Sequence, residues 1–258
     1  IYTLSLHDAL PIYELGARRG PVQRGLRRRS FLPGPMTEFA ALRIPTGPLW
    51  RVGRAGSEFR SSKISPAIAE LPAAGNRFDV LGGGVLYAAS TPEGAFTETL
   101  QAFRPTTAIR AAVFSESPTF MIAGSVPRDW RERRRLACLT LDAPAPFLDI
   151  ECPEIWPLIE SAAAAELCAL GVSHLDVGVI RGANRLVTRL IARWAYLASN
   201  PQSGEPIYGG IYYTSKLGHH ECWAIFDGTQ WRPAGQSRID KHDRAYQKAC
   251  SQLDLVAH

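Results

Sequence analysis

Glu98 is a carboxylate in a stretch that predicts a helix with little bulk around it. Its neighbours at helical spacing are all small, namely Gly94, Ala95 and Ala102. A carboxylate with open space above and below it suits a ligand pocket. A solvated surface glutamate gives the same pattern, so the local sequence alone leaves both interpretations open.

Ser215 is the second candidate for chemistry. It ends the run Gly-Gly-Ile-Tyr-Tyr-Thr of residues 209–214, which predicts a strand, and it precedes Lys216-Leu217-Gly218. A hydroxyl at the end of a strand can face a cleft. A serine that only caps the strand end is the alternative when the residue is considered alone.

Three well-known catalytic patterns are missing from the sequence. Residues 82–84 are three consecutive glycines, but they are not followed by the Gly-Lys-Ser/Thr of a P-loop, and they do not form a Gly-x-Gly-x-x-Gly fingerprint. No Gly-x-Ser-x-Gly elbow of a serine hydrolase is present. The glycines are therefore interpreted as a tight turn.

The run His219-His220-Glu221-Cys222 contains residue types that bind metals. Adjacent residues on an extended chain point to opposite faces, so these four cannot all reach one ion. We expect a polar hairpin loop here and no metal.

The elements that must position Glu98 and Ser215 are predicted by periodicity and by turn signals. Ser90 and Glu93 have capping-box spacing and Pro92 suits a first helical turn, which predicts a helix start after a strand at 85–89. Other predicted strands cover 49–52, 109–114, 119–123, 210–214 and 222–226, and predicted helices cover 66–71, 129–136, 153–170 and 185–197. Strands and helices intermix without regular alternation, which favours an α+β fold.

The composition is that of a soluble protein with a sizeable core. The chain has 258 residues, no long apolar run and five scattered cysteines, which suggests reduced thiols in a cytoplasm. Of the net charge of +5, residues 1–35 contribute +4, because they hold six arginines and only two acids. The remainder is nearly neutral, so charge gives no case for nucleic-acid binding.

Residues 1–35 are expected to lie outside the folded domain. Their first twelve residues resemble the translation of a sequencing adapter, and the following Gly/Arg/Pro-rich stretch lacks periodicity. Met36 is then a plausible start, and residues 36–258 are predicted to form one domain. The alternative is that Arg27 to Arg29 belong to a basic arm for nucleic acid.

Taken together, these pieces resemble the RES-domain family, named for an arginine, a glutamate and a serine. The resemblance covers about residues 40 to 230. The matching stretches are 49–52 (Leu-Trp-Arg-Val), 76–78 (Asn-Arg-Phe), 85–90 (Val-Leu-Tyr-Ala-Ala-Ser) through 95–99 (Ala-Phe-Thr-Glu-Thr), and 210–215 (Gly-Ile-Tyr-Tyr-Thr-Ser). Their order and spacing carry the resemblance, and it implies a single domain with an ADP-ribosyltransferase-like fold of mixed small sheets flanked by helices.

The resemblance also implies the site. Glu98 matches the family glutamate and Ser215 the serine, Arg51 and Arg77 both match family arginines, and Tyr87 matches a pocket tyrosine. The substrate implied is NAD⁺. A carboxylate can stabilise the oxocarbenium character that develops when the nicotinamide–ribose bond breaks, and arginines suit the diphosphate. The region from about 114 to 177 is longer than in compact members.

The function implied is a bacterial cytoplasmic toxin that cleaves NAD⁺ by hydrolysis or phosphorolysis, paired with a helix-turn-helix antitoxin. Transfer of ADP-ribose to a protein is the first alternative, because both reactions use the same pocket. A non-catalytic NAD-binding or interaction module is the second. The expected partners include neither a membrane nor nucleic acid, and a homo-oligomer is possible.

Overall fold

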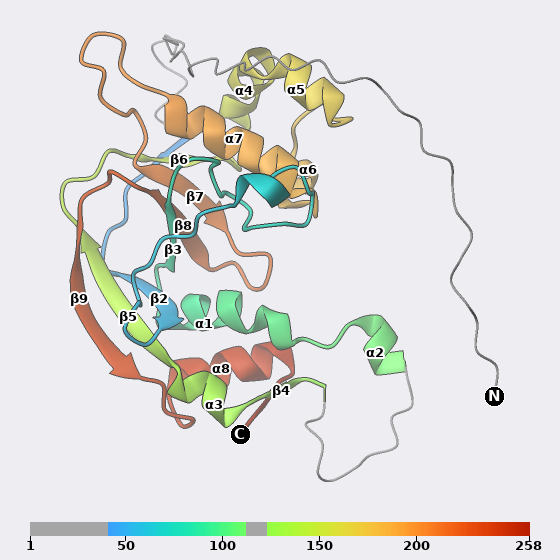
Figure 1. Cartoon of the computed structure of the whole chain (residues 1–258), viewed down its shortest axis with the longest axis vertical. Helices are drawn as coiled ribbons and strands as arrows, with labels where there is room; N and C mark the ends of the chain where they lie inside the picture. The colour runs from blue at the N-terminus through green and yellow to red at the C-terminus, as the bar shows by residue number, and fades with distance from the viewer. Residues whose placement is uncertain (1–40, 112–122) are drawn as a thin grey trace.

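The structure is a computed structural model that describes residues 41–111 and 123–258. Its main feature is one curled sheet of eight strands in the order β1-β6-β7-β8-β3-β2-β5-β9, with only the β6–β7 pair parallel (Figure 1). The strands are β1 (Leu42–Arg43), β2 (Leu49–Arg54), β3 (Val85–Ala89), β5 (Arg134–Leu141), β6 (Phe147–Asp149), β7 (Gly210–Thr214), β8 (Glu221–Phe226) and β9 (Trp231–Arg238). A separate parallel pair joins β4 (Ser125–Val126) to β10 (Val256–Ala257).

Helices cover the sheet in two groups (Figure 1). The helix α1 (Pro92–Leu100) packs against α8 (Arg244–Leu253) near β2. The helix α7 (Arg185–Leu197) packs on β7, next to α6 (Val177–Arg181). The remaining helices are short: η2 (Pro66–Ile68), η3 (Gln101–Phe103), α2 (Thr107–Ala111), α3 (Arg128–Glu132), η4 (Pro153–Ile155), α4 (Trp156–Ala162) and α5 (Ala164–Ala169). The predicted α+β class is confirmed, with most strands joined into one sheet.

The sheet is weakly joined at its middle, between β2 and β3. These neighbours share a single residue pair, Trp50 with Ala89, whereas β2 pairs with β5 along its whole length. Beyond Trp50 the two strands diverge, so the sheet opens there into two walls. This opening decides where the site lies.

The residue that caps the start of α1 lies one position later than predicted. Thr91, not Ser90, accepts the backbone N–H of Gly94 at 3.1 Å, and Pro92 takes the first helical position. Ser90 instead donates to Glu221 and accepts from the indole of Trp223. A serine with strong partners across the sheet is not available to cap the helix.

The apolar side of α1 fixes its rotation. Phe96 and Leu100 are fully buried, and Phe96 meets the ring of Tyr246 of α8 edge to face at 5.5 Å. Anchoring this side against α8 leaves Glu98 on the side that faces the opening of the sheet.

Several predicted elements differ in detail. The predicted helix 153–170 is broken at Ala163, whose φ of −122° ends α4 before α5 begins. The predicted helix 129–136 stops at Glu132 because Arg134 already pairs with β2. Residues 109–111, predicted as strand, are helical in α2. In α7 the bounds 185–197 are confirmed, but Val187, Ile191 and Ala195 form the buried side, while Leu186, Leu190 and Trp194 are half-buried.

Some predictions lie outside the described residues. These are the extension 1–35, the start at Met36, residues 112–114 and most of the run 119–123. Within the described part of the chain, no helix is both long and apolar enough to cross a bilayer.

Candidate active site

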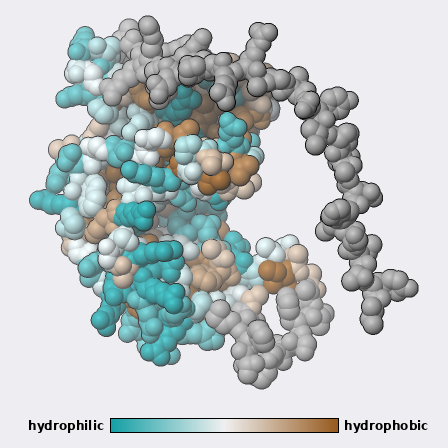
Figure 2. Space-filling model, in the orientation of Figure 1, coloured by the Kyte–Doolittle hydropathy of each residue, from teal (hydrophilic) through white to brown (hydrophobic). Residues whose placement is uncertain are grey.

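A cleft of about 1210 Å³ lies where β2 and β3 diverge. One wall comes from β2, β5 and α1, and the other from β3, the 57–62 and 73–77 loops and the segment after α6. Figure 2 shows an indentation between the upper and lower parts of the molecule on this side. The volume exceeds that of most pockets for drug-sized ligands and suits a larger one.

The cleft is strongly cationic. Of the described residues that line it, one is an acid, Glu98, and seven are basic: Arg51, Arg54, Arg60, Arg77, Arg134, Arg185 and Lys216. Low-dielectric walls that carry one sign of charge concentrate the field inside a cleft. The expected ligand is therefore an anion that carries more than one negative charge.

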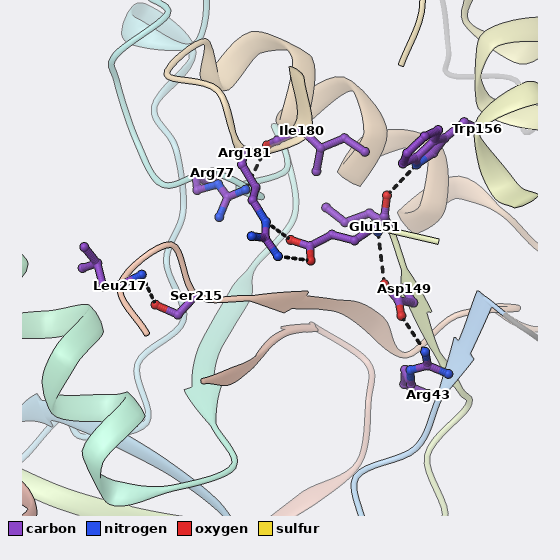
Figure 3. Close-up of polar contacts among 10 residues, drawn as sticks. Arg43, Arg77, Asp149, Glu151, Trp156, Ile180, Arg181, Ser215 and Leu217 are labelled. Carbon is purple, nitrogen blue, oxygen red and sulfur yellow. Dashed lines mark hydrogen bonds and ion pairs between the residues drawn. The ribbon is translucent and has the colours of Figure 1, made fainter. Parts of the chain in front are cut away.

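Glu98 and Ser215 form the central pair of the cleft. The Ser215 hydroxyl donates to Glu98 Oε1 at 2.5 Å, although the two residues are 117 positions apart. The backbone N–H of Leu217 donates to the same hydroxyl oxygen at 3.0 Å, which fixes the rotamer of Ser215 (Figure 3). Ser215 is buried, whereas Glu98 is half-buried and lines the cleft.

Arg77 lies between two aromatic rings beside this pair. Its guanidinium carbon is 4.9 Å from the ring centre of Phe78 and 5.3 Å from that of Tyr213. Its Nη2 donates to the carbonyl of Ile180 at 2.9 Å, and its buried Nε has no partner among the described residues (Figure 3). Burial lowers the pKa of Arg77, and the charges of Tyr213 and Glu98 act in the opposite direction.

Arg51 stands in the middle of β2, on the other wall. Its Nε and Nη1 are buried and have no hydrogen-bond partner within the described ranges. Burial lowers the pKa of Arg51 to about 10. A buried cation without a partner is costly, and an anionic ligand would supply the missing acceptor.

Tyr87 is held by a buried carboxylate that sequence reasoning missed. Its hydroxyl donates to Asp79 Oδ1 at 3.0 Å and accepts the backbone N–H of Phe78 at 3.0 Å. Asp79 also accepts from the Ser62 hydroxyl at 3.0 Å and from the Asn76 backbone at 2.7 Å. Burial and the charge of Asp79 raise the pKa of Tyr87 well above its usual value, so its hydroxyl stays a donor.

The support for Arg77 is itself anchored by an ion pair. Ile180 lies in α6, and the next residue, Arg181, makes two hydrogen bonds to Glu151, at 2.9 and 2.6 Å (Figure 3). Burial is the largest influence and acts to raise the pKa of Glu151, but the hydrogen bonds and charge of Arg181, together with hydrogen bonds from Thr214, outweigh it and the pKa is lowered. The pair fixes α6, and α6 holds the carbonyl that orients Arg77.

All five predicted site residues line the cleft or contact a residue that does. Arg51, Arg77, Tyr87 and Glu98 line it, and Ser215 contacts Glu98. Sequence reasoning missed Asp79, Arg54 and Lys216, and it placed Arg134 in the predicted helix 129–136. The strand β5 (134–141) was not predicted, because it begins with two arginines that continue the charged pattern of the preceding segment. The register that places Arg134 opposite Arg54 comes only from the sheet.

Only the first half of the His219–Cys222 run, predicted as a polar hairpin loop, lies in the loop between β7 and β8. His219 has a left-handed φ of 59°, Glu221 and Cys222 belong to β8, and Cys222 is buried while Glu221 is exposed. No group of three or more metal-binding side chains is found in residues 41–111 and 123–258.

The fold and the site thus define an α+β protein with a carboxylate–hydroxyl pair inside a cationic cleft. The RES domain model matches residues 48–247, so the chain belongs to the RES-domain family. Among solved structures, the chain is similar to one in the crystal structure of the M. tuberculosis MbcT–MbcA toxin–antitoxin complex. The two share 14% sequence identity with a TM-score of 0.46, over 83% of this chain and 95% of that chain. Comparison with curated protein sequences gave no match.

Proposed function

We propose that this RES-domain protein is an enzyme that cleaves the nicotinamide–ribose bond of NAD⁺ by hydrolysis or phosphorolysis. One observation carries the proposal: the Glu98–Ser215 pair, closed at 2.5 Å, lies in a cleft whose other charged residues, among those described, are all cations. A dinucleotide supplies matching features, with a cationic reacting centre at one point and a diphosphate beside it.

Glu98 would act on the reacting carbon. As the bond from the ribose to nicotinamide breaks, its electron pair leaves with nicotinamide, which becomes neutral, and positive charge develops on the ribose. A carboxylate already held in place can stabilise that charge without reorganising. Water or phosphate then bonds to the same carbon, and for water the released proton passes to Glu98 or to solvent.

Ser215 would keep Glu98 in position for this step. Its hydroxyl hydrogen is committed to Glu98 and its oxygen accepts from Leu217, so the carboxylate has one preferred orientation. The second oxygen of Glu98 remains for the ribose hydroxyls or the reacting carbon.

Arg51 and Arg77 would bind the diphosphate from the two walls. Both have buried nitrogen atoms without a partner in the described chain, and planar guanidinium groups match phosphate oxygens in pairs. Tyr87, held by Asp79, lies on β3 in the same wall as Arg77 and can contact the ribose or the nicotinamide ring. No metal is needed for this scheme.

Membership of the RES family supports the biological role that we propose. The protein would be a toxin whose expression depletes NAD⁺, and its partner would be a helix-turn-helix antitoxin. Its site of action would be the cytoplasm, where NAD⁺ is available.

The test is incubation of the purified protein with NAD⁺ labelled in the adenosine part. We expect free labelled ADP-ribose, or its phosphate when inorganic phosphate is added, together with free nicotinamide. Glu98→Gln should lower kcat about 10²–10³-fold, by analogy with removal of one transition-state donor. The same variant should abolish growth arrest and NAD⁺ loss on expression.

A matched control is Glu93→Gln, one and a half turns earlier in α1, where the carboxylate pairs with Lys248 outside the cleft. It should retain activity. Label retained on protein would instead support ADP-ribose transfer. Unchanged NAD⁺ in the presence of folded protein, with Glu98→Gln as toxic as the native chain, would favour a non-catalytic module.

A further inference from the structure

The cationic residues of the cleft do not all lie beside Glu98. Arg54 ends β2 and Arg134 begins β5, and the two are direct cross-strand partners in the antiparallel pair. Like charges placed opposite each other in a sheet destabilise it. Both side chains line the cleft. The exposed Arg60, in the segment that follows β2, lines it as well.

Neither arginine of this pair is held in a direct ion pair by the described residues. Arg134 is nevertheless positioned, because its guanidinium lies 4.7 Å from the ring centre of Trp130 and donates to the Trp130 carbonyl at 3.3 Å. Burial, followed by the charge of Arg54, lowers the pKa of Arg134, and the charge of nearby Asp129 acts in the opposite direction. The exposed Arg54 and the half-buried Arg134 thus place two positive charges side by side at this end of the cleft, and an anion bound between them would relieve their repulsion.

The register of the sheet gives the distance of this pair from the reacting centre. One row across the sheet joins Tyr213, Cys222, Ala89 and Trp50. Ser215 lies two residues past this row in one direction, and Arg54 lies four residues past it in the other. At about 3.3 Å per residue the separation along the strands is roughly 20 Å. Arg51 and Tyr87 fall between these two ends.

This order matches the order of groups along an extended dinucleotide. With nicotinamide and its ribose at Glu98 and the diphosphate at Arg51 and Arg77, the adenosine points toward Arg54. NAD⁺ itself carries no charge at that end, which leaves the Arg54–Arg134 pair unused. A phosphate monoester on the adenosine ribose would place a dianion there, with oxygens for both guanidinium groups.

We propose that Arg54 and Arg134 form a subsite for a phosphate monoester on the adenosine ribose, so that the cleft prefers NADP⁺ to NAD⁺. The proposal rests on the proposed function for its substrate class. The subsite itself follows from the cross-strand pair, and it can be tested without turnover.

The experiment measures calorimetric binding of 2′,5′-ADP and of 5′-AMP to the full chain at one fixed ionic strength. These probes differ by the 2′-phosphate alone, and neither has a nicotinamide bond to cleave. We expect 2′,5′-ADP to bind at least about tenfold more tightly, as two charge-assisted hydrogen bonds imply. Arg54→Gln should remove this difference and leave 5′-AMP binding unchanged.

Arg133→Gln is the matched control, because it removes the same charge one residue away from Arg134. Arg133 is exposed, pairs with Asp129 at 3.2 Å and does not line the cleft, so the preference should persist. Arg54→Gln should not lower the thermal midpoint, because it relieves a like-charge contact. Inorganic phosphate at the concentration of the probe should not enhance 5′-AMP binding.

The subsite would be overturned if the two probes bound equally, or if the preference for 2′,5′-ADP survived Arg54→Gln. It would also be overturned if Arg133→Gln reduced the preference as much as Arg54→Gln does. An enhancement of 5′-AMP binding by inorganic phosphate that requires Arg54 would instead assign the pair to a free anion. Cleavage of NAD⁺ without a preference for 2′,5′-ADP would refute this inference alone. A preference for 2′,5′-ADP without cleavage of NAD⁺ or NADP⁺ would refute the proposed function alone.

Discussion

Two nitrogen atoms of the half-buried Arg51, Nε and Nη1, are buried without a hydrogen-bond partner among the described residues, and burial lowers its pKa to about 10. Because the folded-state pKa lies below that of an unperturbed arginine, the charged form costs stability at neutral pH. That cost is fully present below pH 10 and disappears as the pH rises further. A residue that weakens the empty protein is expected to contribute to ligand binding.

Arg51→Gln should therefore separate stability from function. The thermal midpoint should rise, by about 2–4 °C for each 1 kcal/mol gained, while kcat/KM for NAD⁺ falls about 10²-fold. In the native chain kcat/KM should also fall as the pH rises through about 10, because the neutral guanidine binds phosphate poorly. Calorimetry and initial rates measure these effects.

The control is Arg43→Gln, which changes an arginine paired with Asp149 outside the cleft. It should lower the midpoint, if it changes it at all, and should leave kcat/KM unchanged. An Arg51→Gln protein that is less stable yet fully active would show that this guanidinium is structural.

Asp79 shows what residue types alone do not reveal. Glu98 and Ser215 stand out because small neighbours and a strand end mark them, but Asp79 lies in a short irregular segment without periodicity. Its importance comes from three donors that converge on it from residues 62, 76 and 87. We interpret it as a positioning residue for Tyr87 and for the loop that carries Arg77.

Asp79→Asn should thus impair catalysis through Tyr87. We expect a loss in kcat/KM of about tenfold, since one charge-assisted hydrogen bond to the Tyr87 hydroxyl is weakened. Tyr87→Phe should cause a similar loss, and the double variant should be little worse than either single one. Additive losses in this double-mutant cycle would contradict the assignment.

At the scale of elements, the sequence predicted those helices and strands whose bounds depend on neighbouring residues in the chain. The helix α7 was predicted with the correct bounds because Asn184 caps it and its pattern is regular. The strand β9 was not predicted: most of its residues are exposed, it contains Pro233 and Gly235, and it exists because β5 supplies its partners. The break at Ala163 was missed because the apolar periodicity continues through it.

The start of α1 gives a prediction about stability. Thr91→Ala removes the side chain that accepts the N–H of Gly94 and should lower the free energy of unfolding by about 1 kcal/mol. Because α1 carries Glu98, activity should fall at temperatures near the unfolding midpoint and remain normal well below it. Urea unfolding followed by circular dichroism measures the change.

Thr91→Ser is the conservative control, since serine caps as well as threonine. It should retain most of the free energy of unfolding that Thr91→Ala loses. If Thr91→Ala and Thr91→Ser were equally stable, the cap hydrogen bond would contribute nothing measurable.

At the scale of the molecule, the site depends on contacts that span the chain. Glu98 meets Ser215 across 117 positions, and Arg77 meets Ile180 across 103. Periodicity and spacing could not predict these contacts, because they depend on strand order. The family resemblance supplied that information for five residues, and it could not supply the register that places Arg54 opposite Arg134.

A chain that begins at Met36 tests the predicted domain of residues 36–258. We expect it to unfold cooperatively and to cleave NAD⁺ at the rate of the full chain, because every cleft residue named above lies after residue 50. Circular dichroism and nicotinamide release measure the two properties. Loss of either property, or loss of a nucleic-acid affinity that the full chain possesses, would assign residues 1–35 a role.

The single residue pair between β2 and β3 has a consequence for recognition. Past Trp50, the edge of β2 that faces away from β5 pairs with no named strand among the described residues, although Arg54 at its end forms an isolated bridge with Ser57. A peptide group on that edge that no neighbouring segment pairs would be available to a ligand in the cleft, and it cannot be removed by changing a side chain. An adenine ring or a carboxamide lying there could form hydrogen bonds with the main chain itself, in the way that a neighbouring strand does.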